Sequence, residues 1–141
     1  MYPSASNIPL TARTAIAADL NTALINALDL HSQVKTAHWN IKGAHFVSLH
    51  TLLDDIATEL LAFTDDIAER AVILGGYANG TSQAIAQHSS LEKLPTQIVQ
   101  DIPLISLIAS RIGATVAVLK SARQTADEHT DIDTSDLLTG A

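Results

Sequence analysis

The stretch from His38 to Glu69, HWNIKGAHFVSLHTLLDDIATELLAFTDDIAE, determines how the rest of this chain is interpreted. On a helix that turns about 100° per residue, four side chains of metal-binding type share an arc of roughly 100°: His50, Asp54, Asp65 and Glu69. The apolar residues lie elsewhere, at roughly 200° to 300° from His50: Leu49, Leu52, Leu53, Ile56, Leu60, Phe63, Ile67, Ala71 and Leu74. The metal-binding face therefore points away from the core that this helix would bury.

Distance along the helix excludes one metal site made by this face alone. At about 1.5 Å per residue, Asp54 and Asp65 lie roughly 16 Å apart. If two copies of the helix lie antiparallel across a two-fold axis near Glu59 and Leu60, the start of one helix faces the end of the other. The facing groups would be His50 with Asp54 from one chain and Asp65 with Glu69 from the other. We therefore predict an isologous dimer with two identical sites, which His38 could approach as a fifth ligand.

The spacing of these residues resembles that of the Dps family, the miniferritins of starved bacterial cells. It starts with H-W-N-x-x-G at His38 and continues at intervals of 12, 4, 11 and 4 positions with His50, Asp54, Asp65 and Glu69. Arg70 and the LGG of residues 74–76 follow the last ligand position. The likeness extends from LTAR near the start to DTSDLLTG near the end, so it covers most of the chain.

The resemblance implies a fold and an assembly. The fold is an all-α, ferritin-like four-helix bundle, a single domain over residues 1–141, with a short extra helix in the long crossover between the second and third helices. The assembly is a homo-oligomer, a hollow dodecamer built from two-fold dimers. At ferroxidase centres between subunits, Fe(II) would be oxidised by hydrogen peroxide or oxygen. The ferric product would be stored inside, which protects against oxidative stress.

We interpret the centre as two unequal positions for iron. Asp65 and Glu69 of one subunit, with His38 of its two-fold partner, are expected to hold the tighter iron. His50 and Asp54 of that partner are expected to hold or orient a weaker second iron or a water. Mixed imidazole and carboxylate ligands suit Fe(II) and stabilise Fe(III) once it forms. Trp39 is expected to pack at the dimer contact, and the resemblance also implies a redox role for it beside the iron.

Composition favours a folded cytoplasmic protein. The 141 residues are 47% hydrophobic and 16% charged and include no cysteine, which excludes disulfides and leaves histidine and carboxylates as ligands. Polar and charged residues interrupt the apolar runs, so we expect no membrane span. The start, MYPSASNIPLTAR, lacks the basic and then apolar pattern of a secretory signal.

Three other functions compete with iron storage for this sequence. For a DNA-compacting protein, the formal net charge of −7 and the absence of Lys and Arg from residues 1–12 predict weak or absent DNA binding, which a low-salt gel shift would test. In a non-catalytic helical assembly with little iron chemistry, the same acids would be only a solvated helix face. A di-iron oxygenase site inside the bundle is disfavoured because the chain contains no Glu-x-x-His.

Periodicity and helix-stop residues predict where the helices lie. The expected spans are Thr11 to His38, Val47 to Leu74, a short helix from Thr81 to Gln87, and Ile98 or Asp101 to Ala126, followed by a last helix that starts at Thr134 or Ser135. Only LLTGA follows Asp136, so this last helix is expected to be truncated relative to the family. The acidic segment before it, residues 127–136, would either line a pore or form a solvated loop. His31 is expected to be a hydrogen-bonded or surface histidine and His45 a solvated one, and neither is expected to be a ligand.

Overall fold

The computed structural model describes residues 1–97 and 101–140, and these residues form helices and connections without a strand. The five helices are α1 (Leu10–Asn40), α2 (Phe46–Ile73), α3 (Ser82–His88), α4 (Asp101–Glu128) and α5 (Ile132–Thr139). The prediction of an all-α bundle with a short helix in the crossover and a short last helix is confirmed. A start of the third long helix at Ile98 lies outside the described residues.

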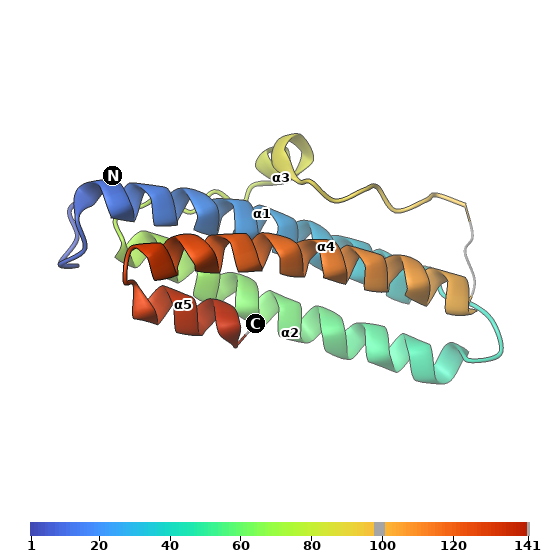
Figure 1. Ribbon diagram of the computed structural model, residues 1–141. Coiled ribbons are helices and arrows are strands. Elements are labelled where there is room, and N and C mark those ends of the chain that lie inside the picture. Colours follow the sequence, from blue (N-terminus) through green and yellow to red (C-terminus); the bar gives the residue numbers. More distant parts are fainter. Residues whose placement is uncertain (98–100, 141) are drawn as a thin grey trace.

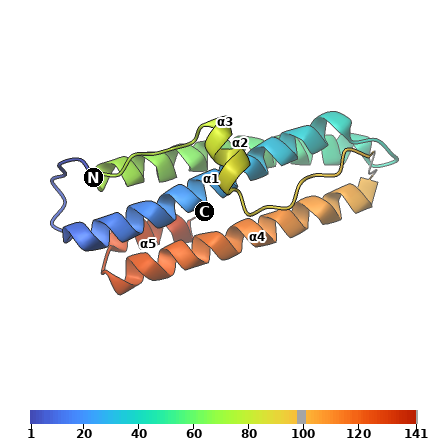
Figure 2. The same ribbon diagram turned by 90° about the horizontal axis from the view of Figure 1, so that it is seen from above.

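Three long helices and one short helix lie side by side along a common direction (Figure 1). Helix α1 is the central element and contacts α2, α3 and α4. Helices α1 and α2 are antiparallel, whereas α2 and α4 run the same way because the crossover returns the chain along the bundle before α4 begins (Figure 2). This parallel pair joined by a long crossover is the arrangement of ferritin-like bundles.

Glycine ends α2 as the sequence predicts. Gly75 has a φ of +88°, the left-handed conformation that glycine adopts without steric cost. A Cβ at this position would also collide with the backbone oxygen of Tyr2, which lies against the turn. The Tyr2 amide donates to the Gly75 carbonyl at 2.6 Å, so the chain start is tied to the end of α2.

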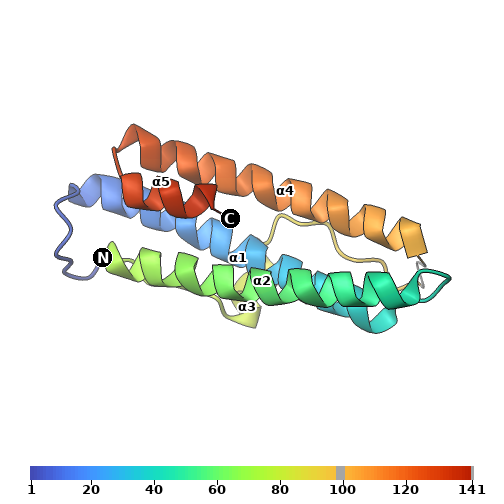
Figure 3. The same cartoon turned by 90° about the horizontal axis from the view of Figure 1, so that it is seen from below.

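The buried face of α2 agrees only in part with the predicted apolar stripe. Leu53, Ile67 and Leu74 are fully buried as expected, but Leu52 is 45% exposed. Figure 3 shows that α5 covers only part of the length between α2 and α4. Beyond its end a cavity of about 260 Å³ remains, and residues of α2 and α4 line it: Ile56, Leu60, Phe63, Ile112, Val116 and Leu119.

Helix α4 corrects the expectation that no segment approaches a membrane span. It is long and apolar enough to cross a membrane, by length and composition only. Only Arg111 and Lys120 carry positive charge between its first turn and residue 122, so the interruptions counted in the sequence are mostly Ser and Thr. A bundle helix with one face in the core satisfies the same criteria, and α4 packs along α1.

A polar stripe on α1, which sequence reasoning missed, fastens the crossover to the bundle. The Asn26 side-chain oxygen accepts from the amide and the hydroxyl of Ser90, at 3.1 and 2.8 Å. Gln33 Nε2 and Arg111 Nε both donate to the Glu92 carbonyl, at 3.2 and 2.9 Å. These bonds satisfy crossover backbone groups that no helix or sheet partner could reach.

Part of the acidic segment, residues 127–136, is buried rather than solvated, and its role as a pore lining stays a prediction. Asp131 is 2% exposed and accepts from Arg70 Nη2 at 2.5 Å. It also caps α5, because its carboxylate accepts from the Thr134 amide at 3.2 Å and from the Thr134 hydroxyl at 2.6 Å. This cap starts α5 at Ile132, two residues before the earlier of the two predicted starts. Asp133, by contrast, is exposed.

Replacing Asp131 by alanine is expected to lower the free energy of unfolding by about 3 kcal/mol, because it leaves the Arg70 guanidinium without its buried partner and removes the α5 cap. Urea-induced unfolding at fixed protein concentration, followed by helical circular dichroism, measures the change. Asp133→Ala is the matched control, since its carboxylate is 83% exposed and lies 3.6 Å from Arg70 Nη1. Equal urea midpoints for the two variants would contradict this assignment.

Candidate metal centre

The end of α1 and the start of α2 bring two of the proposed ligands together. His38 Nδ1 lies 2.8 Å from the backbone oxygen of His50, and His50 Nδ1 lies 3.0 Å from the backbone oxygen of His38. The two rings stack, with centroids 3.7 Å apart and planes 20° apart. The His38 carbonyl is available because it belongs to the last turn of α1, where carbonyls lack a helical partner. Each histidine therefore holds the other through the main chain.

This reciprocal pair of hydrogen bonds determines which nitrogen of each ring can bind a metal. A carbonyl oxygen only accepts, so in both rings Nδ1 must carry the proton and donate it. Nε2 then keeps its lone pair in the neutral imidazole, and neither Nε2 is hydrogen-bonded to a described residue. In metal sites, a ligand histidine is usually held in place by a hydrogen bond that its other ring nitrogen donates. The two side chains are thus prepared as nitrogen donors.

Two aromatic residues flank this histidine pair, and they differ in exposure. Phe46 stacks on His50 with centroids 4.9 Å apart and planes 24° apart, which limits the rotation of that ring. Trp39, next to His38, is 70% exposed. Its expected packing at the dimer contact and its redox role remain predictions, and its exposure leaves the indole available to a neighbouring subunit.

Asp54 lies one helical turn after His50 and is already paired with a cation. Lys35 Nζ lies 2.6 Å from Asp54 Oδ1. The hydrogen bond from Lys35 lowers the pKa of Asp54; desolvation by burial opposes this shift, and the positive charge of Lys35 adds to it. Asp54 is therefore a carboxylate at neutral pH. Sequence reasoning missed Lys35, although its position one turn before His38 on the same helix face was a usable signal.

Asp65 and Glu69 lie farther along α2 and are exposed. With about 1.5 Å of rise per residue, Asp65 is roughly 16 Å along the axis from Asp54, as the spacing predicts. Within residues 1–97 and 101–140, no group of three or more His, Asp or Glu side chains could hold a metal ion. One described chain thus carries two separate sets of donors on one helix rather than a complete pocket.

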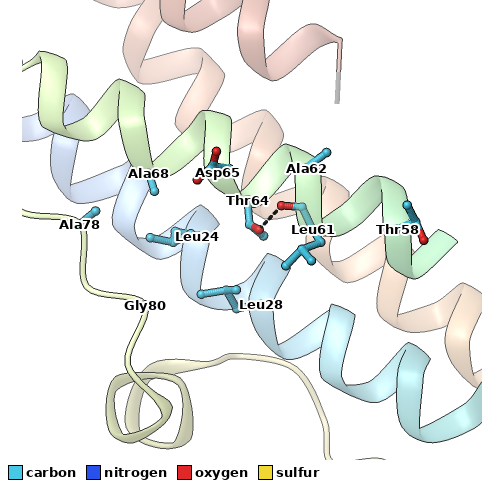
Figure 4. A pocket seen from close by; sticks show the side chains of 10 residues that line it. All are labelled: Leu24, Leu28, Thr58, Leu61, Ala62, Thr64, Asp65, Ala68, Ala78 and Gly80. Carbon is cyan, nitrogen blue, oxygen red and sulfur yellow. Dashed lines mark hydrogen bonds between the residues drawn. The ribbon is translucent and has the colours of Figure 1, made fainter. Parts of the chain in front are cut away.

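An open apolar groove of about 600 Å³ runs beside Asp65, between α1 and α2 (Figure 4). Its walls include Leu24 and Leu28 of α1 and Leu61 of α2, and Ala78 and Gly80 of the crossover lie on its other side. Leu61 is 54% exposed although it is a large apolar residue. This groove lies at the middle of α2, where the predicted two-fold axis passes.

The remaining histidines of this region behave as non-ligands. Burial, and then the positive charge of Lys35, lower the pKa of His31, so this ring is neutral at neutral pH. His45 is 60% exposed in its side chain, and its Nδ1 lies 2.9 Å from Asp101 Oδ1. The expectation that His45 would be merely solvated therefore omitted a contact that links the α1–α2 loop to the start of α4.

Comparison with known proteins decides the family. A family model described as a ferritin-like domain matches residues 17–141. The "DNA protection during starvation protein" of Agrobacterium fabrum is 34% identical over 140 residues, which cover 99% of this chain and 86% of that protein. The chain belongs to the Dps family of the ferritin-like superfamily.

Solved Dps structures agree with the fold. DpsC from Streptomyces coelicolor is 30% identical, with a TM-score of 0.89 over 99% of this chain and 80% of the other. Dps from Microbacterium arborescens, solved in a high iron form, is 28% identical, with a TM-score of 0.87 over 97% of this chain and 87% of that one. The resemblance inferred from the ligand spacing, and with it the ferritin-like bundle, is confirmed.

Proposed function

We propose that this Dps-family protein is a miniferritin that oxidises Fe(II) with hydrogen peroxide, or with oxygen, at sites shared between two subunits. The ferric product is stored in a hollow homo-oligomer, a dodecamer built from two-fold dimers, in the cytoplasm. The donors are His38, His50 and Asp54 of one subunit with Asp65 and Glu69 of its partner.

The reciprocal histidine pair carries this proposal most directly. In both stacked imidazoles, Nδ1 donates its proton to a backbone oxygen. The Nε2 atoms make no hydrogen bond to a described residue, so they are free to bind a cation. Their carboxylate complement, Asp65 and Glu69, sits unpaired by any described basic residue on the outer face of the same helix. Imidazole and carboxylate together suit iron in both oxidation states.

Two iron ions at one centre match the electron demand of peroxide. Each Fe(II) gives one electron, and the two electrons break the O–O bond of one hydrogen peroxide, so no hydroxyl radical is released. With two water molecules, the products are two ferric oxyhydroxide units and four protons. Ferric iron, a hard cation, then stays with oxygen ligands on the acidic interior of the assembly.

The apolar groove beside Asp65 supports the two-fold partner. Leu61, half-exposed in one chain, would meet its own copy near an axis between Glu59 and Leu60, which buries apolar surface that a monomer leaves wet. The same contact brings the histidine end of one α2 opposite the Asp65 end of the other. Assembly and metal binding thus depend on one surface.

Compaction of DNA is the weaker candidate. The chain start contacts the end of α2, where Tyr2 donates to Gly75 and the Ser4 hydroxyl donates to the Ile73 carbonyl at 2.6 Å. Arg13, the first basic side chain, is engaged by two backbone oxygens, those of Ile8 and Leu74, at 3.1 and 2.9 Å. Because Arg13 is engaged by the protein itself and the net charge is −7, the chain start offers little positive charge to bind DNA phosphates.

Subunit complementation tests the proposal. One variant carries His50→Ala with Asp54→Ala, the other carries Asp65→Ala with Glu69→Ala, and each alone is expected to oxidise Fe(II) at a background rate. In a mixed dimer, one of the two pockets receives all its donors from the intact halves. Random pairing of equal amounts is therefore expected to restore about a quarter of the wild-type rate.

The mixture is made by co-expression, and native mass spectrometry gives the fraction of mixed assemblies. Stopped-flow absorbance of ferric iron, after adding Fe(II) and hydrogen peroxide anaerobically, gives the rate. A rate that stays at background in verified mixed assemblies would reject a pocket shared in this way. High activity in either parent alone would reject the ligand assignment itself.

A further inference from the structure

The crossover between α2 and α3 contains an asparagine followed by a glycine, Asn79 and Gly80. No other asparagine of the sequence precedes a glycine. Both residues are exposed and lie in an irregular stretch that ends where α3 begins. Because glycine has no Cβ, its amide nitrogen can approach the preceding side chain with little steric hindrance. The Gly80 nitrogen can therefore reach the side-chain amide of Asn79.

The hydrogen bonds around Asn79 orient its side chain for an attack by that nitrogen. The Asn79 backbone amide donates to Asn21 Oδ1 of α1 at 2.9 Å, which holds the residue in place. The Thr81 hydroxyl donates to Asn79 Oδ1 at 3.1 Å, so a donor lies at the oxygen that becomes negative when the carbonyl carbon Cγ is attacked. The Gly80 amide donates to no described residue. The attacking nitrogen is thus free, and the attacked carbonyl is already polarised.

We propose that Asn79 and Gly80 form a site of spontaneous deamidation, at which the side-chain amide is lost through a cyclic succinimide. The Gly80 nitrogen forms a bond to Asn79 Cγ, the Cγ–Nδ2 bond breaks, and Nδ2 leaves as ammonia with the proton that the Gly80 nitrogen gives up. Water then opens the ring at one of its two carbonyl carbons. Opening at Cγ gives aspartate, and opening at the backbone carbonyl carbon gives isoaspartate. The reaction consumes only water and is independent of the iron chemistry proposed above.

Isoaspartate is the product that changes the crossover most. It carries a carboxylate in place of the neutral amide, and its main chain runs through Cγ, which adds one methylene group before Gly80. The chain has little room for this group, since a Cβ at Gly80 would lie 2.8 Å from Leu28 Cδ1. Thr81, the next residue, caps α3 by accepting from the Ala84 amide at 3.3 Å. The added length is therefore expected to loosen this cap.

The same change reaches the apolar groove between α1 and α2. Gly80 and Leu28 both line that groove, with Gly80 on the crossover and Leu28 on α1 (Figure 4). A shift of Gly80 thus moves one wall of the groove. Deamidation is a slow covalent change at a surface that a second subunit is expected to use.

Asn7 is a matched internal control for Asn79. It is also exposed and outside the helices, but Ile8 follows it. The β-branched side chain of Ile8 crowds the Ile8 nitrogen, and that nitrogen already donates to the Ser6 hydroxyl at 3.2 Å. If exposure alone governed the reaction, both asparagines would react. The proposed mechanism makes Asn79 the reactive one.

The experiment incubates the purified full chain in neutral buffer made with heavy-oxygen water, beside a free peptide of residues 77–83, YANGTSQ. After digestion in ordinary water, mass spectrometry with fragmentation that separates aspartate from isoaspartate locates the heavy oxygen that hydrolysis introduced. Asn79 is expected to react at least about ten-fold faster than Asn7 and to give both products. An Asn79 that is intact when the free peptide has fully reacted overturns the proposal, and so does equal reaction at Asn7.

Two variants test the two reacting groups. Asn79→Gln keeps a neutral amide, but its longer side chain would have to form a larger ring, so no heavy oxygen is expected at position 79 over the same time. Gly80→Ala places a Cβ beside the attacking nitrogen and is expected to slow the reaction about ten-fold or more. Because that Cβ also meets Leu28, circular dichroism checks its fold, and Asn79→Gln serves if it does not fold.

Hydrogen exchange of α3 reports the structural consequence. Amides of α3 in aged wild type are expected to exchange faster than in fresh protein, whereas those in aged Asn79→Gln are expected to stay unchanged. Equal loosening of α3 in the two aged proteins would overturn the assignment to Asn79.

Discussion

Replacing Asp65 and Glu69 together by alanine is expected to slow peroxide-driven oxidation of Fe(II) by about 100-fold or more, while the oligomer stays assembled. Both carboxylates are exposed on α2, so their loss removes metal donors without opening the core. The donors that remain are two neutral imidazoles and Asp54, whose charge is already paired with Lys35, so they offset little of the charge that Fe(III) gains. The rate at two Fe(II) per pocket, measured by stopped-flow absorbance, is the decisive quantity.

The chain offers a close control for this double variant. Asp55 and Asp66 are two further exposed carboxylates on the same helix, on another face and away from Glu59 and Leu60. Their replacement by alanine removes the same charge, and the initial oxidation rate is expected to remain within about two-fold of wild type. Equal losses in both double variants would mean that total negative charge, not ligation, governs the reaction.

Replacing Leu61 by glutamate is expected to dissociate the two-fold dimer and to lower Fe(II) oxidation by about 100-fold, although all five proposed donors remain in the chain. Leu61 is 54% exposed and lines the apolar groove at the middle of α2. Across an isologous contact the substitution places two like charges near each other in an apolar setting. Light scattering after size exclusion gives the mass, and circular dichroism shows whether the helices persist.

Leu61→Met keeps the volume and the apolar character, so it is expected to assemble and to oxidise Fe(II) as wild type does. Full activity of a folded, monomeric Leu61→Glu protein would refute a centre shared between subunits. It would do so even if the complementation result were ambiguous, because this test changes the assembly and leaves every donor in place.

Helical periodicity alone accounts for much of what could be predicted. The spacing of His50, Asp54, Asp65 and Glu69 determines their shared face and their separation along α2, because the pitch of an α-helix is nearly invariant. Gly75 likewise predicts the end of α2, since few other residues accept its φ of +88°. The helix spans agree within about two residues for the same reason. The resemblance to Dps rested on this local regularity.

The contacts between helices were decided only by the tertiary structure. No periodicity says that the Nδ1 of each histidine reaches the other's carbonyl, that Lys35 holds Asp54, or that Asp131 is buried against Arg70. Each depends on the angle and register at which two helices pack, and these follow from the whole set of core contacts rather than from one segment. Sequence by itself determined which residues share a helix face; packing determined which of them are free to bind and which are already engaged.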